Sequence, residues 1–270
     1  MKIRLFLISF FLINLFAHSN CRAVENGTIC HDARHFIRMG VNLWHTPARF
    51  RSSDWEKVGL VTGSTALLFL TDKDIRRFAQ SHQNHANNRL FNFDSVYGNG
   101  YTAAMTAGIY GFGLLFEQPS MRKTGLRTME ALFYSGLITS GIKVLLGRRR
   151  PYGGDSHLFF KPFQLDAVYK SLPSGHTTVS FAVSTVLAKS MDNACWKTFW
   201  YGAAGMVAAS RIYHNAHWFS DVFLGGIIGY SVASFVMKSD DGELSENHSH
   251  LFKEITPYFA GHEAGLAFRF

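Results

Sequence analysis

The apolar residues of the chain fall into six runs that are separated by polar segments. Each run is about 13 to 18 residues long. Runs of this length favour helices, because buried strands span only about 4 to 8 residues. The six runs cover 57–70, 100–116, 131–147, 177–191, 198–210 and 221–237. No strands separate them as a Rossmann-type sheet would require, so the pattern predicts an all-α fold, a helical bundle of about six core helices.

The segments outside the runs divide the chain into four parts. We expect a signal peptide at 1–23, an N-terminal arm or loop at 24–52, the helical domain at 53–238, and a polar linker with a tail at 239–270. "SDWE" at Ser53–Glu56 has the form of a capping box, which predicts the start of the first core helix.

Two short elements complete the prediction. "TDKDIRRFAQ" at 71–80 has the pattern of a short amphipathic helix. In the tail, the large apolar residues Leu266, Phe268 and Phe270 alternate with Ala267 and Arg269. This spacing of two is the periodicity of a strand. Gly261 lies before this strand, so we expect a small C-terminal β-hairpin.

The N-terminus resembles a secretory signal peptide. Lys2 and Arg4 precede an apolar stretch at 5–17, and small residues follow it. We expect cleavage after Ser19 or Ala23. The alternative, an uncleaved anchor helix, is disfavoured because the apolar stretch is short for a membrane span.

Two properties bear on whether the helices lie in a membrane. The runs are shorter than the ~20 residues that a span usually needs, and the mean hydropathy of +0.01 is low for a protein with many spans. The runs are nevertheless rich in Gly, Ala, Ser and Thr, as packed membrane helices are. Trp44, Trp55, Trp200 and Tyr201 suit a membrane interface. We expect a membrane-embedded bundle, with a large soluble bundle as the alternative.

Charge and cysteine content limit the class of partner. The net charge of +8 fits nucleic acid, anionic lipid or a phosphorylated substrate. The densest cationic cluster, Arg148–Arg150, lies inside an apolar pattern instead of a basic tail, so we expect no nucleic-acid partner. Cys21, Cys30 and Cys195 are too few for a disulfide framework. A Cys21–Cys30 bond would form only if cleavage spared Cys21, and no spacing resembles a metal site.

"KSLPSGHTTVS" at 170–180 is the first candidate for chemistry. Ser174, Gly175 and His176 directly precede an apolar run. The free N–H groups of a helix N-terminus bind anions, and a histidine there supplies a proton. The alternative is a simple turn in which Ser174 caps the following helix.

"KVLLGRRRP" at 143–151 is the second candidate. Lys143 and Arg150 are seven residues apart, so a continuing helix would bring both to one face, and Pro151 marks its end. Two cations on an apolar helix are costly unless an anion lies between them. The alternative is a cationic helix end at a membrane surface, to which Arg148 and Arg149 also contribute.

"SRIYHNAHWFSDV" at 210–222 is the third candidate. His217 and Asp221 are one helical turn apart, so Asp221 is placed to accept a hydrogen bond from one ring nitrogen of His217. That bond would leave the other nitrogen free as a nucleophile. The alternative is that Asp221 caps the next helix and His217 is only nearby. His214 is expected to line the pocket or lie on the surface.

The three stretches complement one another as a phosphate site. Lys143, Arg150 and Arg211 supply positive charge, and Ser174 and the backbone N–H of Gly175 supply directed donors. Three cations repel one another unless an anion lies among them. A bound phosphate would remove that repulsion.

The sequence resembles the superfamily of type 2 phosphatidic acid phosphatases and vanadium haloperoxidases. The matching motifs are Lys-x6-Arg-Pro at 143–151, Pro-Ser-Gly-His at 173–176 and Ser-Arg-x5-His-x3-Asp at 210–221. Every motif position is filled, in the same order, and the resemblance covers roughly 55–238. It implies a helical bundle with the site between helices, and six spans in the membrane branch.

The resemblance also implies a role for each matching residue. His217 would attack phosphorus and form a phosphohistidine, Asp221 would hold His217, and His176 would protonate the leaving oxygen and then help to activate water. The residues implied to bind the phosphoryl oxygens are Lys143, Arg150, Ser174, Gly175 and Arg211. No metal or other cofactor is implied, since the cations serve that purpose.

We therefore expect a metal-independent phosphatase that acts on a lipid phosphate or pyrophosphate. Candidate substrates are undecaprenyl pyrophosphate, phosphatidic acid, phosphatidylglycerol phosphate and the lipid A phosphates. The partners would be the phosphorylated lipid and the membrane, and the location the bacterial inner membrane with the site facing the periplasm. The alternatives are a soluble periplasmic acid phosphatase, a phosphotransferase, and a phospholipid-binding membrane protein without activity. The short chain and membrane-like composition disfavour a haloperoxidase.

Overall fold

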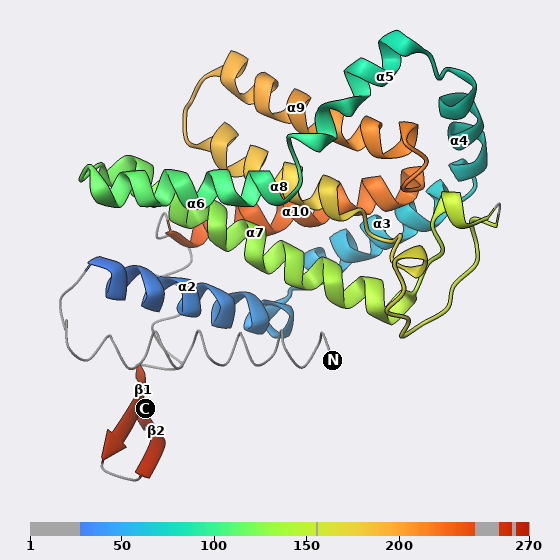
Figure 1. Cartoon of the computed structure of the whole chain (residues 1–270). Coiled ribbons are helices and arrows are strands. Elements are labelled where there is room, and N and C mark those ends of the chain that lie inside the picture. The colour runs from blue at the N-terminus through green and yellow to red at the C-terminus, as the bar shows by residue number, and fades with distance from the viewer. Residues whose placement is uncertain (1–27, 155, 241–253, 261–262, 270) are drawn as a thin grey trace.

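Helices make up most of the described chain (Figure 1). The structure, a computed structural model, describes residues 28–154, 156–240, 254–260 and 263–269. The expected signal peptide, Cys21 and the hairpin turn at Gly261 lie outside these residues, so their predictions stay untested.

Each of the six predicted runs lies on a helix. These helices are α3 (Ser52–Leu68), α6 (Gly100–Leu115), α7 (Pro119–Leu146), α8 (Gly175–Lys189), α9 (Ala194–Tyr213) and α10 (Phe219–Asp240). The expected short amphipathic helix is α4 (Asp72–Ser81), and α5 (His85–Phe91) follows it. With α2 (Thr28–His45), the described residues form nine α-helices. Short 3-10 turns cover Thr46–Arg49, Asn92–Ser95, Pro151–Gly153 and Ala167–Tyr169.

The N-terminal arm is helical where an arm or loop was expected. In α2, Met39 is buried, and Phe36 and Leu43 pack against the same core cluster, which includes Tyr134 of α7. These three residues have helical spacing and form one apolar face. Charged and polar residues between them lower the average hydropathy, which concealed the helix in the sequence. The start of α3 also differs: the N-cap is Arg51, and the capping box spans Arg51–Asp54 instead of Ser53–Glu56, with the backbone N–H of Arg51 donating to Asp54 Oδ2 at 3.2 Å.

The centre of the bundle is α8, which packs against α7, α9 and α10. Val183 and Val186 of α8 are fully buried in two core clusters. Gly229 lets α10 approach α8 closely, because a Cβ there would lie only 2.3 Å from the carbonyl oxygen of Thr178. This close contact places the first turn of α8 beside the middle of α10.

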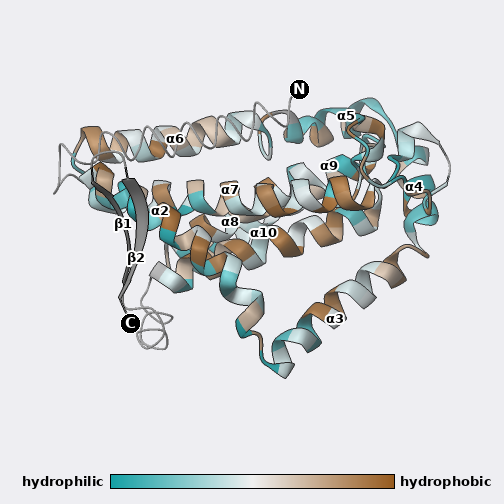
Figure 2. Cartoon of the chain, turned by 90° about the horizontal axis from the view of Figure 1, so that it is seen from below, coloured by the Kyte–Doolittle hydropathy of each residue, from teal (hydrophilic) through white to brown (hydrophobic). Residues whose placement is uncertain are grey.

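Two helices have the length and composition to cross a membrane. The candidate spans are Pro119–Leu146 and Phe219–Ser239. In Figure 2, α3 leans away from the other helices, and its apolar residues Trp55, Leu60 and Leu67 are exposed. An apolar helix that is exposed in this way suits a lipid environment. The described residues thus contain two candidate membrane spans, whereas the resemblance implied six.

The C-terminal tail forms the expected pair of strands. Strands β1 (Glu254–Ala260) and β2 (Glu263–Arg269) are antiparallel, with Ile255 opposite Phe268 and Pro257 opposite Leu266. The alternation read in the sequence therefore does mark a strand.

Candidate active site

Backbone and side-chain contacts join the three sequence motifs at one end of the bundle. Lys143 Nζ donates to the carbonyl oxygen of Pro173, which links the first motif to the second. The backbone N–H of Ser174 donates to the carbonyl oxygen of Asp221 at 2.9 Å, which links the second to the third. Arg150 Nη1 lies 3.4 Å from the carbonyl oxygen of Ala216 and links the first to the third.

Lys143 and Arg150 meet through a turn and not on one helix face, as the sequence had suggested. Helix α7 ends at Leu146, and Gly147 follows with a φ of +60°. A Cβ at Gly147 would lie 1.7 Å from the carbonyl oxygen of Lys161, so the turn requires glycine. Arg150 is then placed by the loop, where its Nε donates to the carbonyl oxygen of Ala167 at 3.0 Å.

The ammonium group of Lys143 is fixed by backbone carbonyls. Besides Pro173, it donates to the carbonyl oxygens of Lys170 at 2.8 Å and Ser171 at 3.4 Å. A Cβ at Gly175 would meet no heavy atom nearer than Lys143 Cε, at 3.9 Å. The space in front of the N-terminus of α8 is therefore open to a ligand and faced by a fixed cation.

Ser174 occupies the N-cap position of α8, but its side chain makes no capping hydrogen bond. Its Oγ accepts a hydrogen bond from Thr177 Oγ1 at 2.9 Å. The hydroxyl hydrogen of Ser174 is left free to donate, because its oxygen serves as the acceptor here. The simple capping alternative is thus wrong for this side chain.

His176 stands in the first turn of α8, close to the cations. Burial lowers its pKa to about 4, and the charges of Arg211, Arg150 and Lys143 act in the same direction, while Asp94 opposes them. All three predicted cations therefore lie near this imidazole. In the absence of an anion His176 is neutral at pH 7.

His217 is 2% exposed and lies just before α10. Burial lowers its pKa to about 3, Asp221 opposes this, and the charges of Lys143 and Arg150 lower it further. A neutral imidazole keeps a lone pair, which a nucleophile needs. The expected hydrogen bond to Asp221 is wrong for this structure, because Nδ1 lies 3.7 Å from Oδ2. The reason is that α10 begins at Phe219, so the two residues do not share a helical turn.

Asp221 is fully buried and accepts three hydrogen bonds. Oδ2 accepts from Ser171 Oγ at 2.5 Å and from the backbone N–H of Trp218 at 2.9 Å, and Oδ1 accepts from Arg148 Nη1 at 2.6 Å. The bond from Trp218 caps the start of α10, so Asp221 is both a cap and a neighbour of His217. Ser171 has no signal in the sequence that points to this contact.

Arg148 does not lie at a membrane surface, as one alternative suggested. Its side chain is fully buried between Asp221 and Asp72, with Nη2 at 2.6 Å from Asp72 Oδ2. Asp72 is the first residue of α4 and lies 76 positions away in the chain. Only the tertiary structure brings these charges together.

Arg211 is held by Asp94, whose Oδ2 lies 2.5 Å from Nη1 of Arg211. Nε of Arg211 is buried and has no hydrogen-bond partner among the described residues. His214 Nε2 lies 3.0 Å from the carbonyl oxygen of Phe91, and its side chain is 36% exposed. His214 therefore lies at the solvent-exposed edge of the site.

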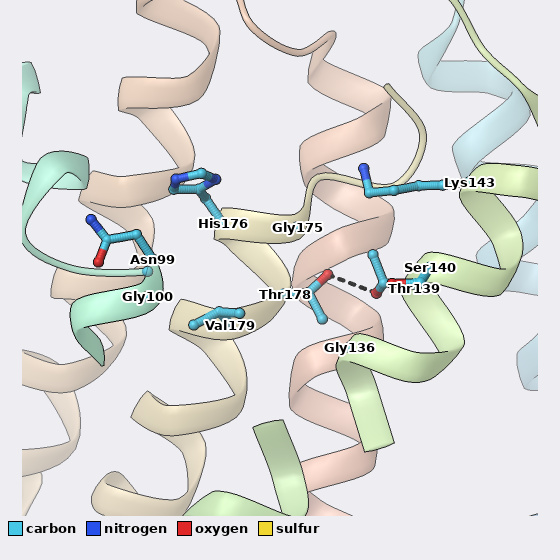
Figure 3. A pocket seen from close by; sticks show the side chains of 11 residues that line it. Asn99, Gly100, Gly136, Thr139, Ser140, Lys143, Gly175, His176, Thr178 and Val179 are labelled. Atoms are coloured by element: carbon cyan, nitrogen blue, oxygen red, sulfur yellow. Dashed lines mark hydrogen bonds between the residues drawn. The ribbon is translucent and has the colours of Figure 1, made fainter. Parts of the chain in front are cut away.

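A pocket of about 320 Å³ opens beside these residues. On α7, Gly136, Ser140 and Lys143 follow one another at helical spacing along its wall, and Gly175 and His176 of α8 face them. Figure 3 shows His176 and Lys143 on either side of Gly175. The small residues on α7 give the pocket its width. Within the described ranges, no group of three His, Cys, Asp or Glu side chains is placed to hold a metal ion.

Comparison with known proteins adds independent findings. Residues 124–243 match the PAP2 superfamily, and this range contains all three motifs. The lipid A 1-phosphatase of Porphyromonas gingivalis is 24% identical over 242 residues, 85% of this chain and 49% of that protein. Lipid phosphate phosphatase 1 of Arabidopsis thaliana is 33% identical over 138 residues, 41% of this chain and 42% of that protein. The chain spans about half the length of the curated relatives it matches.

The fold is similar to a crystal structure of a transmembrane PAP2 type phosphatidylglycerolphosphate phosphatase from Bacillus subtilis. The TM-score is 0.52 with 18% sequence identity, and the match covers 67% of this chain and 94% of that one.

Proposed function

Because the chain belongs to the PAP2 superfamily, we propose that it hydrolyses a lipid phosphate or pyrophosphate through a phosphohistidine. The observation that carries this proposal is the convergence of three cations on two neutral histidines, of which His217 is buried and His176 is partly buried at the pocket. Lys143, Arg150 and Arg211 all lower the pKa of His176, and the first two also lower that of His217. A phosphate bound among the cations would cancel their mutual repulsion.

Each residue then has a chemical task. Nε2 of His217 attacks phosphorus while the bond to the leaving oxygen breaks, and His176 gives that oxygen a proton. His176 is neutral without substrate, and the anionic phosphate raises its pKa so that it holds the proton in the complex. His176 then takes a proton from the water that cleaves the phosphohistidine. The charges of the three cations and the donors at Ser174 and Gly175 stabilise the phosphoryl oxygens throughout.

Three observations support a lipid as the substrate. The pocket continues from His176 and Lys143 along the small residues of α7, which leaves a path for the rest of the substrate. Helices α7 and α10 are candidate membrane spans, so this path lies along a helix that suits lipid. The relatives from Porphyromonas gingivalis and Arabidopsis thaliana are named for lipid A and lipid phosphate. The proposed location is a bacterial membrane, with the site at the periplasmic surface.

The test is phosphate release by the purified full chain in detergent without added metal. The substrates compared are phosphatidic acid, undecaprenyl pyrophosphate, lipid A and p-nitrophenyl phosphate. Release from a lipid that is lost in His217→Ala, but kept in the control His85→Ala at an exposed histidine, would support the proposal.

Three other results would count against it. Preference for p-nitrophenyl phosphate would favour a soluble-type acid phosphatase. Release that survives His217→Ala would contradict the phosphohistidine. Release only after an alcohol acceptor is added would favour a phosphotransferase.

A further inference from the structure

The guanidinium of Arg148 uses all five of its N–H groups inside the protein. Nε and Nη2 donate to the carbonyl oxygen of His157 at 3.0 and 2.7 Å. Nη1 donates to Ser220 Oγ at 2.7 Å and to Asp221 Oδ1 at 2.6 Å. The second hydrogen of Nη2 goes to Asp72 Oδ2 at 2.6 Å. No donor of Arg148 is left for a phosphate, so this cation serves another purpose than Arg150.

Asp72 completes a buried group of three charges. Its Oδ1 accepts from the backbone N–H of Ser220 at 2.9 Å, and its Oδ2 accepts from Ser220 Oγ at 2.7 Å as well as from Arg148. Asp72, Arg148 and Asp221 are all fully buried. Two carboxylates thus share one guanidinium, and the group carries one net negative charge.

The two oxygens of Asp221 face different partners. Oδ1 is held by Arg148, whereas Oδ2 faces His217 Nδ1 at 3.7 Å. If Arg148 had no second carboxylate, it would neutralise Asp221, and His217 would face an uncharged pair. Because Asp72 neutralises Arg148, the charge of Asp221 is left for His217.

We propose that Arg148 and Asp72 are positioning residues for the reaction at His217: Arg148 holds Asp221 in place, and Asp72 cancels the charge of Arg148. The inference rests on the proposed phosphatase function. In the first step, the Nε2–phosphorus bond forms and the bond to the leaving oxygen breaks. That oxygen keeps the electron pair and takes a proton from His176. The ring of His217 is left with a positive charge. The carboxylate of Asp221 stabilises that charge only if Arg148 does not neutralise the carboxylate first.

A purely structural role is the competing explanation. The same contacts join the start of α4 to the loop after α7 and to the start of α10, and a buried ion pair that loses one partner destabilises a fold. The two explanations predict different effects when the charge of one of these residues is removed. A structural anchor affects stability, whereas the proposed role affects kcat and depends on the charge balance among the three residues.

The experiment measures phosphate release from phosphatidic acid by the full chain in detergent. Turnover is normalised to the protein that elutes as a single species in gel filtration. Asp72→Asn is expected to lower kcat about 10- to 100-fold, as outer-shell partners commonly do, with KM changed by less than about twofold.

The matched control is Asp32→Asn. Asp32 is also a buried carboxylate paired with an arginine, Arg122 at 3.3 Å, and it accepts from Tyr110 at 2.9 Å. Arg122 lies near the start of α7, and Lys143 lies near its end. This variant is expected to lower the melting temperature without changing kcat.

A second variant separates charge from anchoring. Arg148→Gln alone leaves two facing carboxylates that compete for a proton, so it is also expected to be slow. Asp72→Asn combined with Arg148→Gln leaves Asp221 as the only charge. The double variant is expected to be about tenfold faster than Asp72→Asn, a coupling typical of contacting residues.

Three results would overturn the inference. One is a kcat for Asp72→Asn that equals that of Asp32→Asn. Another is a double variant slower than both single variants. The third is an inactive wild type, which would overturn the proposed function and this inference together. The first two results would overturn this inference alone.

Discussion

Nδ1 of His217 lies 3.7 Å from Oδ2 of Asp221, too far for a hydrogen bond and near enough for a strong interaction between charges. In the resting protein His217 is neutral and gains little from this neighbour. In the proposed reaction, phosphorylation of Nε2 would make the ring cationic, and Asp221 would then stabilise it. This arrangement would favour the intermediate over the resting state, as catalysis requires.

Replacing Asp221 tests this relationship. Asp221→Asn keeps the shape and removes the charge, so we expect kcat to fall on the order of a hundredfold or more. Arg148 keeps its ion pair with Asp72 in this variant, so no buried charge is left uncompensated, and we expect the free energy of unfolding to fall by only about 1–3 kcal/mol through weakened hydrogen bonds. Single-turnover phosphate release and chemical denaturation measure the two effects. Asp192→Asn is the control, because Asp192 forms an exposed ion pair with Lys197 and contributes little. A kcat for Asp221→Asn within threefold of wild type would contradict the charge argument.

The two histidines also predict how stability depends on pH. The pKa of His217 is lowered to about 3 and that of His176 to about 4, both below the ordinary value near 6.5. Below pH ~6.5 the unfolded chain takes up protons that the folded chain does not bind. The stabilisation is therefore complete above that pH and is lost as the pH falls from about 6.5 towards about 4 for His176 and about 3 for His217.

Melting temperatures in detergent between pH 7.5 and 5 measure this dependence. His217→Gln is expected to reduce the dependence of stability on pH, because the variant loses about one proton of difference between the unfolded and folded chains. His82→Gln, at an exposed histidine, is measured in parallel as the control. Equal slopes for His217→Gln and wild type would show that His217 is protonated in the folded state, against the structure.

The pocket predicts a substitution that selects between substrates. Gly136 lines the pocket, whereas Gly141 on the same helix does not, and a Cβ at either position meets no atom within 4 Å. Gly136→Leu is therefore expected to fold and to fill the path of the lipid chain. We expect kcat/KM for phosphatidic acid to fall about tenfold or more while that for p-nitrophenyl phosphate changes little.

Gly141→Leu is the matched control and should leave both values unchanged. Equal losses on both substrates in Gly136→Leu would mean that the pocket does not carry the lipid. Assays with short-chain and long-chain phosphatidic acid sharpen the comparison, because we expect only the long chain to reach past Gly136.

The turn after α7 predicts a strong effect on folding. Gly147→Ala puts a methyl group at a φ of +60° and against the carbonyl oxygen of Lys161. We expect a loss of more than about 2 kcal/mol in the free energy of unfolding, and loss of activity, because Arg150 is placed by this loop. Gly141→Ala should instead be neutral or stabilising, since alanine favours helix. Yield and denaturation curves report the difference, and a Gly147→Ala protein as stable as Gly141→Ala would contradict the turn geometry.

The sequence by itself determined the six core helices, because their apolar runs are longer than strands and have clear polar boundaries. It also marked Lys143, His176 and His217 as one site, because residue types that bind and transfer phosphate recur in three short stretches. These signals are local. They depend on spacing along the chain and on the chemistry of single side chains, and both are visible without coordinates.

Only the tertiary structure decided how the site is held. The pairing of Arg148 with Asp72 joins residues 76 positions apart, and Ser171 reaches Asp221 across 50 positions. Neither contact has a period or a motif. The helical α2 was also missed, because its narrow apolar face is interrupted by charged residues. Buried charges are placed by the partners that compensate them, and those partners are fixed only when distant helices pack together.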